Sequence, residues 1–334
     1  MKHVIATLAG LAVLGAIAGL AVVFFGLFDT SARRGHWAIT DWAMHTTFEN
    51  AVKWRAPAAS EVPPDLDDPA LIELGARHYA SACVTCHATP GRDADATIAA
   101  MVPHPPQIQQ AVKPWQPQHL HWIVDQGVKM TGMPAWPAEG RKDEVWAVVA
   151  FLNAVRDGMT AEDYTALTQT GEQGYCASCH GPDGTSRAPR LDILSPDYIA
   201  ASLAAYRSGA RASGIMQHAA SKLPATADAR LASAMADLPA PPRPAVTGDA
   251  DAGAVLADQG AGEVPSCLAC HGPQNRNPLI PSLDGQGQSY LAAQLRLWRD
   301  GHRGGAARAP LMAQAAQQLT DDQIAALAAY FAMR

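Results

Sequence analysis

The sequence predicts an all-α protein in which one N-terminal transmembrane helix precedes three small helical domains in tandem. Three observations lead to this prediction. Residues 4–28 carry no charge, the pattern C-x-x-C-H occurs three times, and each occurrence precedes an amphipathic segment with helical period. The predicted boundaries are an anchor at 1–30, an interfacial segment and linker at 31–66, and domains at 67–158, 159–240 and 247–334.

The composition agrees with small helical domains. Of the 334 residues, 48% are hydrophobic, and the formal net charge is −6. This charge is not basic enough to indicate nucleic-acid binding. A domain of about 80–100 residues is small for a core made of side chains alone. Each domain would therefore gain from a further apolar body at its centre.

The uncharged N-terminal run is long enough to cross a membrane. Its 25 residues would form a helix of about 37 Å, against a hydrocarbon core of roughly 30 Å. A cleaved signal peptide is the alternative, but the one A-x-A pattern, Ala16–Ala18, lies inside the run rather than after it. We expect an uncleaved anchor. Flanking charges, with Lys2 on one side and Arg33 and Arg34 on the other, hardly decide its orientation.

Aromatic residues follow the anchor. Trp37, Trp42, Phe48 and Trp54 lie among charged residues. Aromatic side chains beside a span often sit at the membrane interface, which predicts a helix lying on or rising from the membrane. Alternatively, the rings pack on the first domain. Residues 56–69, rich in Pro, Ala and Asp, are expected to form a linker.

The C-x-x-C-H motifs use every cysteine in the chain. Cysteines three positions apart share one face of a helical turn, so that two thiols can bond both vinyl groups of one porphyrin. The following histidine becomes the proximal ligand of the iron. The pattern is typical of heme c attachment. It predicts three covalent hemes, held by Cys83, Cys86 and His87, by Cys176, Cys179 and His180, and by Cys267, Cys270 and His271.

Other uses of paired cysteines fit less well. A structural zinc site needs four ligands, usually from two such pairs, and three pairs leave one over. Disulfides form in oxidising compartments, but they do not explain a histidine after every second cysteine. A C-x-x-C redox motif would be expected in a βαβ context, and no strand pattern is evident.

Helix signals frame each domain. Asp68 and Pro69 predict an N-cap with proline at the first helical position, and Thr320 with Gln323 predicts a capping box. Residues 159–172 and 239–248 are expected to separate the domains. The closing helices follow from apolar stripes at Val145, Val148, Val149 and Leu152, at Leu231, Ala234, Met235 and Leu238, and at Ile324, Leu327, Ala328 and Phe331.

Domains two and three form an internal repeat. The segments 189–211 and 281–303 match at ten or more positions with a constant offset of 92, against 91 at the motifs. This regularity indicates duplication. Domain two is nevertheless short before Cys176, with little room for a first helix.

A heme iron with a proximal histidine has a sixth coordination position, and methionine there raises the potential. Domain one offers three candidates, Met101, Met130 and Met133. Met133 is favoured because proline follows it, and Met130 is the alternative. A lone methionine otherwise fills a core, the role expected of Met235. The predicted iron ligands are His87 with Met133, His180 with Met216, and His271 with Met312, and each methionine is expected to lie in a loop.

A second nitrogen on each histidine should donate to a fixed acceptor that orients the ring. The pattern P-x-[LI] follows each motif, at Pro106, Pro189 and Pro281. The proline carbonyl would serve as that acceptor. Alternatively, the pattern marks a turn with a packed side chain, and both can hold.

On these motifs the chain resembles the class I cytochromes c over nearly all residues beyond 66. Domains two and three resemble the tandem diheme proteins of the cytochrome c4 type, and domain one resembles single-heme domains in its 127–134 ending, Gly-Val-Lys-Met-Thr-Gly-Met-Pro. The resemblance implies a small helical bundle around each heme, with thioether, histidine, methionine and proline roles as assigned above. It also implies attachment outside the cytoplasm, and so heme domains in the periplasm on a single-pass inner-membrane anchor.

With both axial positions filled by protein, outer-sphere electron transfer is the expected function, and catalysis by this chain is not. We expect a membrane-tethered triheme cytochrome c between a membrane-associated donor and a periplasmic acceptor. The donor would be a dehydrogenase or a quinol-oxidising complex, and the acceptor a terminal oxidase or a soluble cytochrome. An alternative is the cytochrome subunit of a quinone-linked alcohol, aldehyde or sugar dehydrogenase. A peroxidase-like enzyme would need one open iron, and a structural anchor would need no electron flow.

Overall fold

The computed structural model describes residues 1–169, 174–241, 243–306 and 308–334. Within these ranges the regular secondary structure is helical, and its one β-type feature is an isolated bridge between Ala261 and Val264. The predicted all-α class is therefore confirmed. The separators expected at 159–172 and 239–248 include positions 170–172 and 242, which lie outside the described residues.

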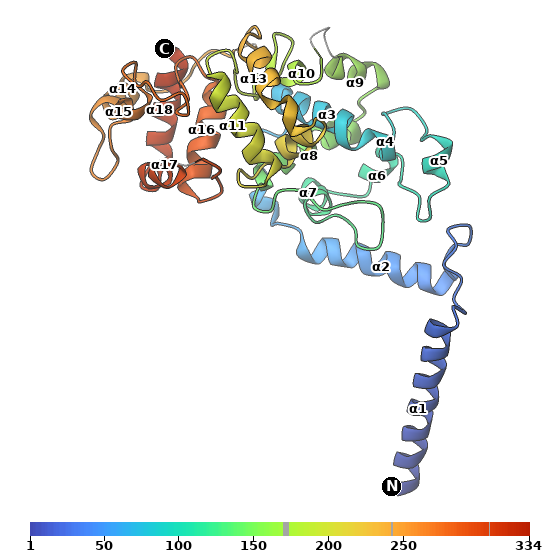
Figure 1. Cartoon of the computed structure of the whole chain (residues 1–334). Helices are drawn as coiled ribbons and strands as arrows, with labels where there is room; N and C mark the ends of the chain where they lie inside the picture. The colour runs from blue at the N-terminus through green and yellow to red at the C-terminus, as the bar shows by residue number, and fades with distance from the viewer. Residues whose placement is uncertain (170–173, 242, 307) are drawn as a thin grey trace.

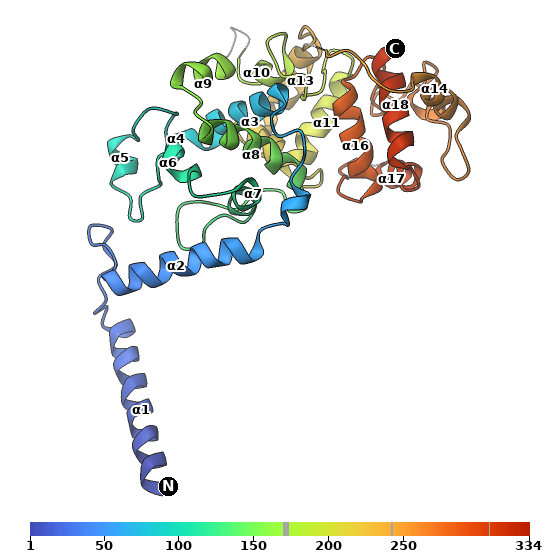
Figure 2. The ribbon, with the colours of Figure 1, turned by 180° about the vertical axis from the view of Figure 1, so that it is seen from behind.

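The N-terminal helix α1 (Lys2–Phe24) extends away from the rest of the protein (Figures 1 and 2). It is 23 residues long with a mean hydropathy of 2.3, and none of it is buried. By length and composition it can cross a membrane, although a signal sequence would meet the same criteria. The helix ends before the predicted limit at Phe28 because Gly26 takes a left-handed conformation with φ of 62°.

Helix α2 (Ala38–Arg55) lies between α1 and the domains. The Phe48 ring meets Trp115 edge-on at 5.8 Å, and Val52 is fully buried. By contrast, Trp42 and Trp54 are 63% and 85% exposed. Phe48 therefore packs on domain one, as the second of the two interpretations has it, whereas Trp42 and Trp54 stay uncovered.

Domain one is built on two helices that cross closely, α3 and α8. A Cβ atom on Gly75 of α3 would lie 2.0 Å from the Ala147 carbonyl oxygen of α8, so only glycine allows this approach. Asp68 caps α3 as predicted. The helices are α3 (Pro69–Ala82), α4 (Val84–His87), α5 (Ala96–Ala99), α6 (Ile108–Val112), α7 (Pro117–Gln126) and α8 (Lys142–Arg156).

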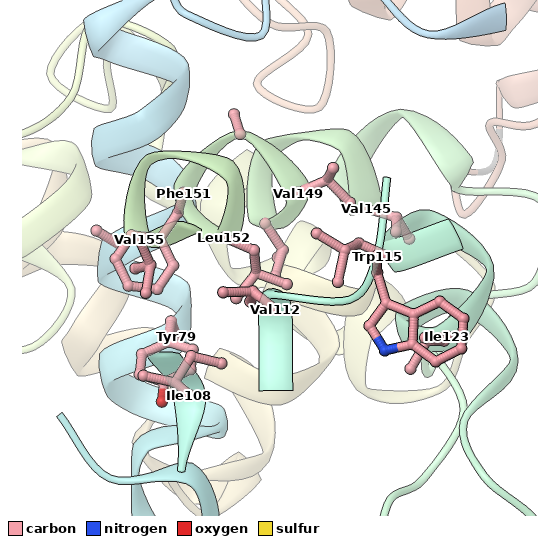
Figure 3. Close-up of a cluster of buried hydrophobic side chains, with 14 of the residues drawn as sticks. Tyr79, Ile108, Val112, Trp115, Ile123, Val145, Val149, Phe151, Leu152 and Val155 are labelled. Atoms are coloured by element: carbon pink, nitrogen blue, oxygen red, sulfur yellow. The ribbon is translucent and has the colours of Figure 1, made fainter. Parts of the chain in front are cut away.

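Figure 3 shows the core of domain one, where apolar side chains from α3, α6, α7 and α8 meet. The predicted stripe from Val145 to Leu152 is buried there. Helix α9 (Ala161–Thr168) also joins this core, because Tyr164 is buried with its ring 6.1 Å from that of Tyr79. The first part of the expected separator is thus a helix packed on domain one.

Domain three repeats this crossing. A Cβ atom on Gly253 would lie 2.1 Å from the Ala326 carbonyl oxygen. The capping box of Thr320 and Gln323 is present, and the predicted stripe of the closing helix is buried. The helices are α14 (Ala250–Gln259), α15 (Leu268–His271), α16 (Gln288–Arg299), α17 (Ala309–Ala316) and α18 (Asp321–Met333).

Domain two lies between its neighbours (Figures 1 and 2). In the residues described between α9 and Cys176, no helix opens it. Its closing stripe differs from the prediction at Ala234, which is exposed. The buried residues of α13 are Asp228, Ala232 and Met235, spaced i, i+4 and i+7, so the buried face of the helix is turned toward Ala232 and away from Ala234. The helices are α10 (Ala177–His180), α11 (Pro196–Arg207), α12 (Gly214–Ser221), the 3₁₀ turn η2 (Ala225–Ala227) and α13 (Asp228–Ala236).

Candidate heme-binding sites

Each C-x-x-C-H motif folds into a single helical turn. The turn closes with a backbone hydrogen bond, in which the main-chain N–H of the histidine donates to the carbonyl of the first cysteine. The N···O distance is 3.0 Å in domain one, 3.1 Å in domain two and 2.8 Å in domain three. A helical turn places positions three apart on one face. The two thiols of each motif therefore lie on the same side, with the histidine directly after them.

The three motif histidines share one hydrogen bond. Nδ1 lies 2.9 Å from a proline carbonyl oxygen in each case, and the pairs are His87 with Pro106, His180 with Pro189, and His271 with Pro281. A carbonyl can only accept, so Nδ1 carries the proton and the Nε2 lone pair is left for a metal. Burial lowers the pKa of His180 and of His271, which favours the neutral imidazole that ligation requires.

The cysteines are free thiols rather than disulfides. Burial raises the pKa of the Cys83 and Cys267 thiols to about 11, whereas a redox-active C-x-x-C pair needs a lowered pKa. In the described part of the chain no group of three or more His, Cys, Asp and Glu side chains could hold a metal ion, so a zinc site finds no support. Two thiols three positions apart on one helical turn, followed by an imidazole that carries its proton on Nδ1, are the donor set that fits heme c.

In the loop of domain one, the Met133 side chain packs toward the domain core, whereas the Met130 side chain points to solvent. Val128 N–H donates to the Met133 carbonyl at 3.1 Å, and Met133 N–H donates to Thr131 Oγ1 at 3.1 Å. Met133 is half-buried against the core, whereas Met130 is 82% exposed. Gly127 permits the tight loop, because its φ is 64° and a Cβ atom there would lie 2.5 Å from the carbonyl carbon of Pro134.

The methionines of domains two and three lie in short helices and not in loops as predicted. Met216 is in the first turn of α12, where its N–H donates to the capping Ser213 hydroxyl. Met312 is in α17, whose first turn contains Pro310. Both are half-buried against the core of their own domain. Met235 is buried in the core of domain two, as expected of a filler.

Sequence reasoning missed the residues that link the domains. Gln286 of domain three forms two hydrogen bonds with the backbone of Arg190, at 2.8 and 3.1 Å, directly after Pro189. Arg77 and Glu144 of domain one reach into domain two, and both side chains are buried. In the sequence, Arg77 and Glu144 look like ordinary charged residues of a surface helix. Only the structure shows that their charged groups are buried.

Comparisons with known proteins agree with this geometry. The family described as cytochrome c oxidase, cbb3-type, subunit III matches residues 70–152, and the family described as cytochrome c matches residues 250–332. The thiosulfate dehydrogenase electron acceptor of Stutzerimonas stutzeri is 36% identical over 214 residues, which cover 59% of this chain and 94% of that protein. Cytochrome c4 of Azotobacter vinelandii is 31% identical over 183 residues, covering 49% of this chain and 87% of that protein.

Among solved structures, a thiosulfate dehydrogenase from Marichromatium purpuratum is 38% identical with a TM-score of 0.43. The match covers 48% of this chain and 36% of that one, so the chain spans about a third of its length. The relatives and the two matched domains give the same assignment as the motifs. The chain belongs to the class I cytochromes c, electron-carrying proteins whose domains bind heme c covalently.

Proposed function

We propose that the chain is a membrane-tethered triheme cytochrome c that carries single electrons between a membrane-associated donor and a periplasmic acceptor or terminal oxidase. Heme c supplies the one-electron redox chemistry when it is bound. The observation that carries the proposal is the contact repeated in all three domains, in which Nδ1 of the motif histidine lies 2.9 Å from a proline carbonyl. Domain two has this contact as well, although both family matches lie outside it.

The chain's own residues divide the work at each site. The cysteine pairs would form the thioether bonds, the proline carbonyls would hold the histidine rings, and each imidazole would bind iron through Nε2. The irons would be held by His87 with Met133, by His180 with Met216, and by His271 with Met312. The heme domains would occupy residues 67–158, 159–240 and 247–334.

The N-terminal segment supports a membrane location. Helix α1 is uncovered and apolar, and α2 presents Trp42 and Trp54 on its exposed face. Trp is enriched where proteins meet lipid head groups. The proposal therefore has α1 crossing the inner membrane, α2 at its surface and the heme domains in the periplasm.

The related proteins favour one class of electron donor. Proteins named thiosulfate dehydrogenase electron acceptors match this chain over most of their own length. We therefore favour a periplasmic dehydrogenase that oxidises thiosulfate or a similar small anion over a quinol-oxidising complex. The runner-up is the cytochrome subunit of a quinone-linked alcohol, aldehyde or sugar dehydrogenase.

Reduction by the two donor classes tests this choice. The oxidised, heme-loaded full chain in detergent would be mixed with a purified thiosulfate dehydrogenase and thiosulfate, and heme reduction followed optically. We expect rapid reduction that requires both enzyme and substrate. Reduction by a quinone-linked alcohol dehydrogenase with its alcohol, and none with thiosulfate, would favour the runner-up.

Carbon monoxide tests whether each iron is closed. The reduced protein should not bind carbon monoxide at neutral pH, because a methionine would hold the sixth position of each iron. Met312→Ala should open the third iron to carbon monoxide and lower its potential, whereas Met235→Leu should change neither. An unchanged third potential in Met312→Ala would show the ligand assignment to be wrong, and binding by the unsubstituted protein would favour a peroxidase-like site.

A further inference from the structure

Two helices of domain one hold two separate parts of domain two. Arg77 lies in α3 and Glu144 in α8, and their exposed fractions are only 9% and 8%. Buried charges are stable only when they are paired and hydrogen-bonded. For both residues, most of the partners belong to domain two.

Arg77 holds the second C-x-x-C-H turn. Its Nη1 donates to the Ser178 carbonyl, which lies between the two cysteines of the motif. Its Nη2 donates to the Asp183 carbonyl at 2.8 Å, just after the motif histidine. Glu73, one turn earlier in α3, pairs with the same guanidinium at 2.7 Å and keeps it in place. The segment that carries His180 is therefore attached to α3.

Glu144 holds the start of the helix that carries Met216. Its carboxylate accepts from the Ser213 hydroxyl, from Gly214 N–H at 2.6 Å and from Ile215 N–H at 3.3 Å. A carboxylate at a helix N-terminus satisfies backbone donors that otherwise lack partners. Arg141 pairs with Glu144 at 2.8 Å and donates to the Ala212 carbonyl at 2.6 Å, so the same pair also fixes the residue before the cap.

Domain two needs this external support because its own frame is incomplete. In domains one and three an opening helix crosses the closing helix at Gly75 and at Gly253. Helix α9 lies within 159–240 but packs on domain one, and no helix is present in the residues described between α9 and Cys176. The buried apolar cluster of domain two is also the smallest of the three. Among the residues that the structure describes, nothing equivalent to the α3–α8 crossing therefore sets the spacing between the motif of domain two and its methionine helix.

We propose that Arg77 and Glu144 are positioning residues for the second heme, through which domain one sets the placement of His180 relative to Met216. Methionine ligation and the potential of that heme then depend on a neighbouring domain. The inference rests on the proposed heme at the second motif. It predicts that a change in domain one alters the iron of domain two and leaves the iron of its own domain unchanged.

The test uses the heme-loaded full chain with Glu144→Gln, Arg77→Gln and Arg77→Lys. Glu144→Gln keeps the side-chain size but loses the charge, and Arg77→Lys keeps the charge but loses the second donor arm. Matched controls are Glu162→Gln and Arg230→Gln, at exposed residues near the same domains. Intact mass counts the hemes, NMR of the reduced protein follows the ligating methionine methyl signals, and a redox titration gives the three potentials.

Met216→Leu identifies the methyl signal of the second heme, since only that signal should vanish. We expect Glu144→Gln and Arg77→Gln to weaken the same signal, raise carbon monoxide binding from near zero to about one per chain, and lower one potential of three. Arg77→Lys should fall between, and the controls should match the unsubstituted protein. Should Glu144→Gln fail to mature, Glu144→Asp, which shortens the reach by one methylene, provides the same readout.

Two results would overturn the inference. One is an unchanged methyl signal and unchanged potentials in both charge-removing variants, which would make the contacts structural only. The other is loss of the signal from the first heme in place of the second. Failure of the underlying function is separate, because an unsubstituted protein whose mass shows no heme on the second motif fails before any variant is compared.

Discussion

Domains one and three build their frames from within, whereas domain two takes part of its frame from its neighbours. In domains one and three, a glycine lets the opening and closing helices cross in contact. Domain two is contacted from both sides, by Arg77 and Glu144 of domain one and by Gln286 of domain three. Domains two and three are the pair related by sequence repeat, so the comparison teaches that duplicated units need not keep the same source of stability.

The largest expected effect comes from replacing the glycines at the two helix crossings. Gly75→Ala and Gly253→Ala would each place a Cβ atom about 2 Å from a carbonyl oxygen of the facing helix, so that the helices must move apart. We expect destabilisation of at least about 3 kcal/mol in the affected domain, at the upper end of overpacking effects. Thermal unfolding followed by heme absorbance would measure it.

Gly35→Ala is the control for this prediction, since no atom lies within 4 Å of a Cβ atom there and its φ is not left-handed. If Gly75→Ala and Gly253→Ala were as stable as Gly35→Ala, the crossings would not frame domains one and three. The contrast with domain two would then lose its basis.

The stability of the contact between domains one and two should depend on pH, through His78. His78 of α3 lies 5.7 Å from the His218 ring and 5.0 Å from Trp136. Burial, together with nearby His218 and Lys222, lowers the pKa of His78 to about 4. The unfolded chain takes up this proton below about pH 6.5, but the folded chain does so only near pH 4, so stability falls as the pH drops through this window.

The expected loss between pH 7 and pH 4 is about 3 kcal/mol, from about 1.4 kcal/mol for each unit of pKa. Denaturant midpoints across this range would measure it. His78→Gln should remove most of the pH dependence, whereas substitution of the exposed His104 should leave it intact. An equal pH dependence in His78→Gln would assign the effect to other groups.

The smallest expected effect concerns helix caps. Thr320 caps the closing helix of domain three, while Ala227, at the corresponding place in domain two, makes no side-chain cap. Thr320→Ala should cost about 1 kcal/mol. Chemical unfolding would check this value, and Thr320→Ser, which keeps the hydroxyl, should be nearly neutral. Equal losses in both variants would show that the cap itself is not what stabilises α18.

Local chemistry was predictable from the sequence, and contacts between domains were not. The C-x-x-C-H turns, the Asp68 and Thr320 caps and the proline acceptors each depend on residues close in the chain, or on a pattern repeated three times. Arg77 lies 101 positions from Ser178, and no local pattern links them. The closing helix of domain two was misjudged at Ala234 because a helical period fits more than one face of a short helix, and the face that is buried carries Asp228, Ala232 and Met235.

The most direct test of the central claim is the intact mass of the full chain after maturation in a periplasm. The account predicts a mass equal to the polypeptide plus three hemes, all retained after treatment with acidic organic solvent. A mass equal to the bare polypeptide, or hemes that extract into the solvent, would contradict it.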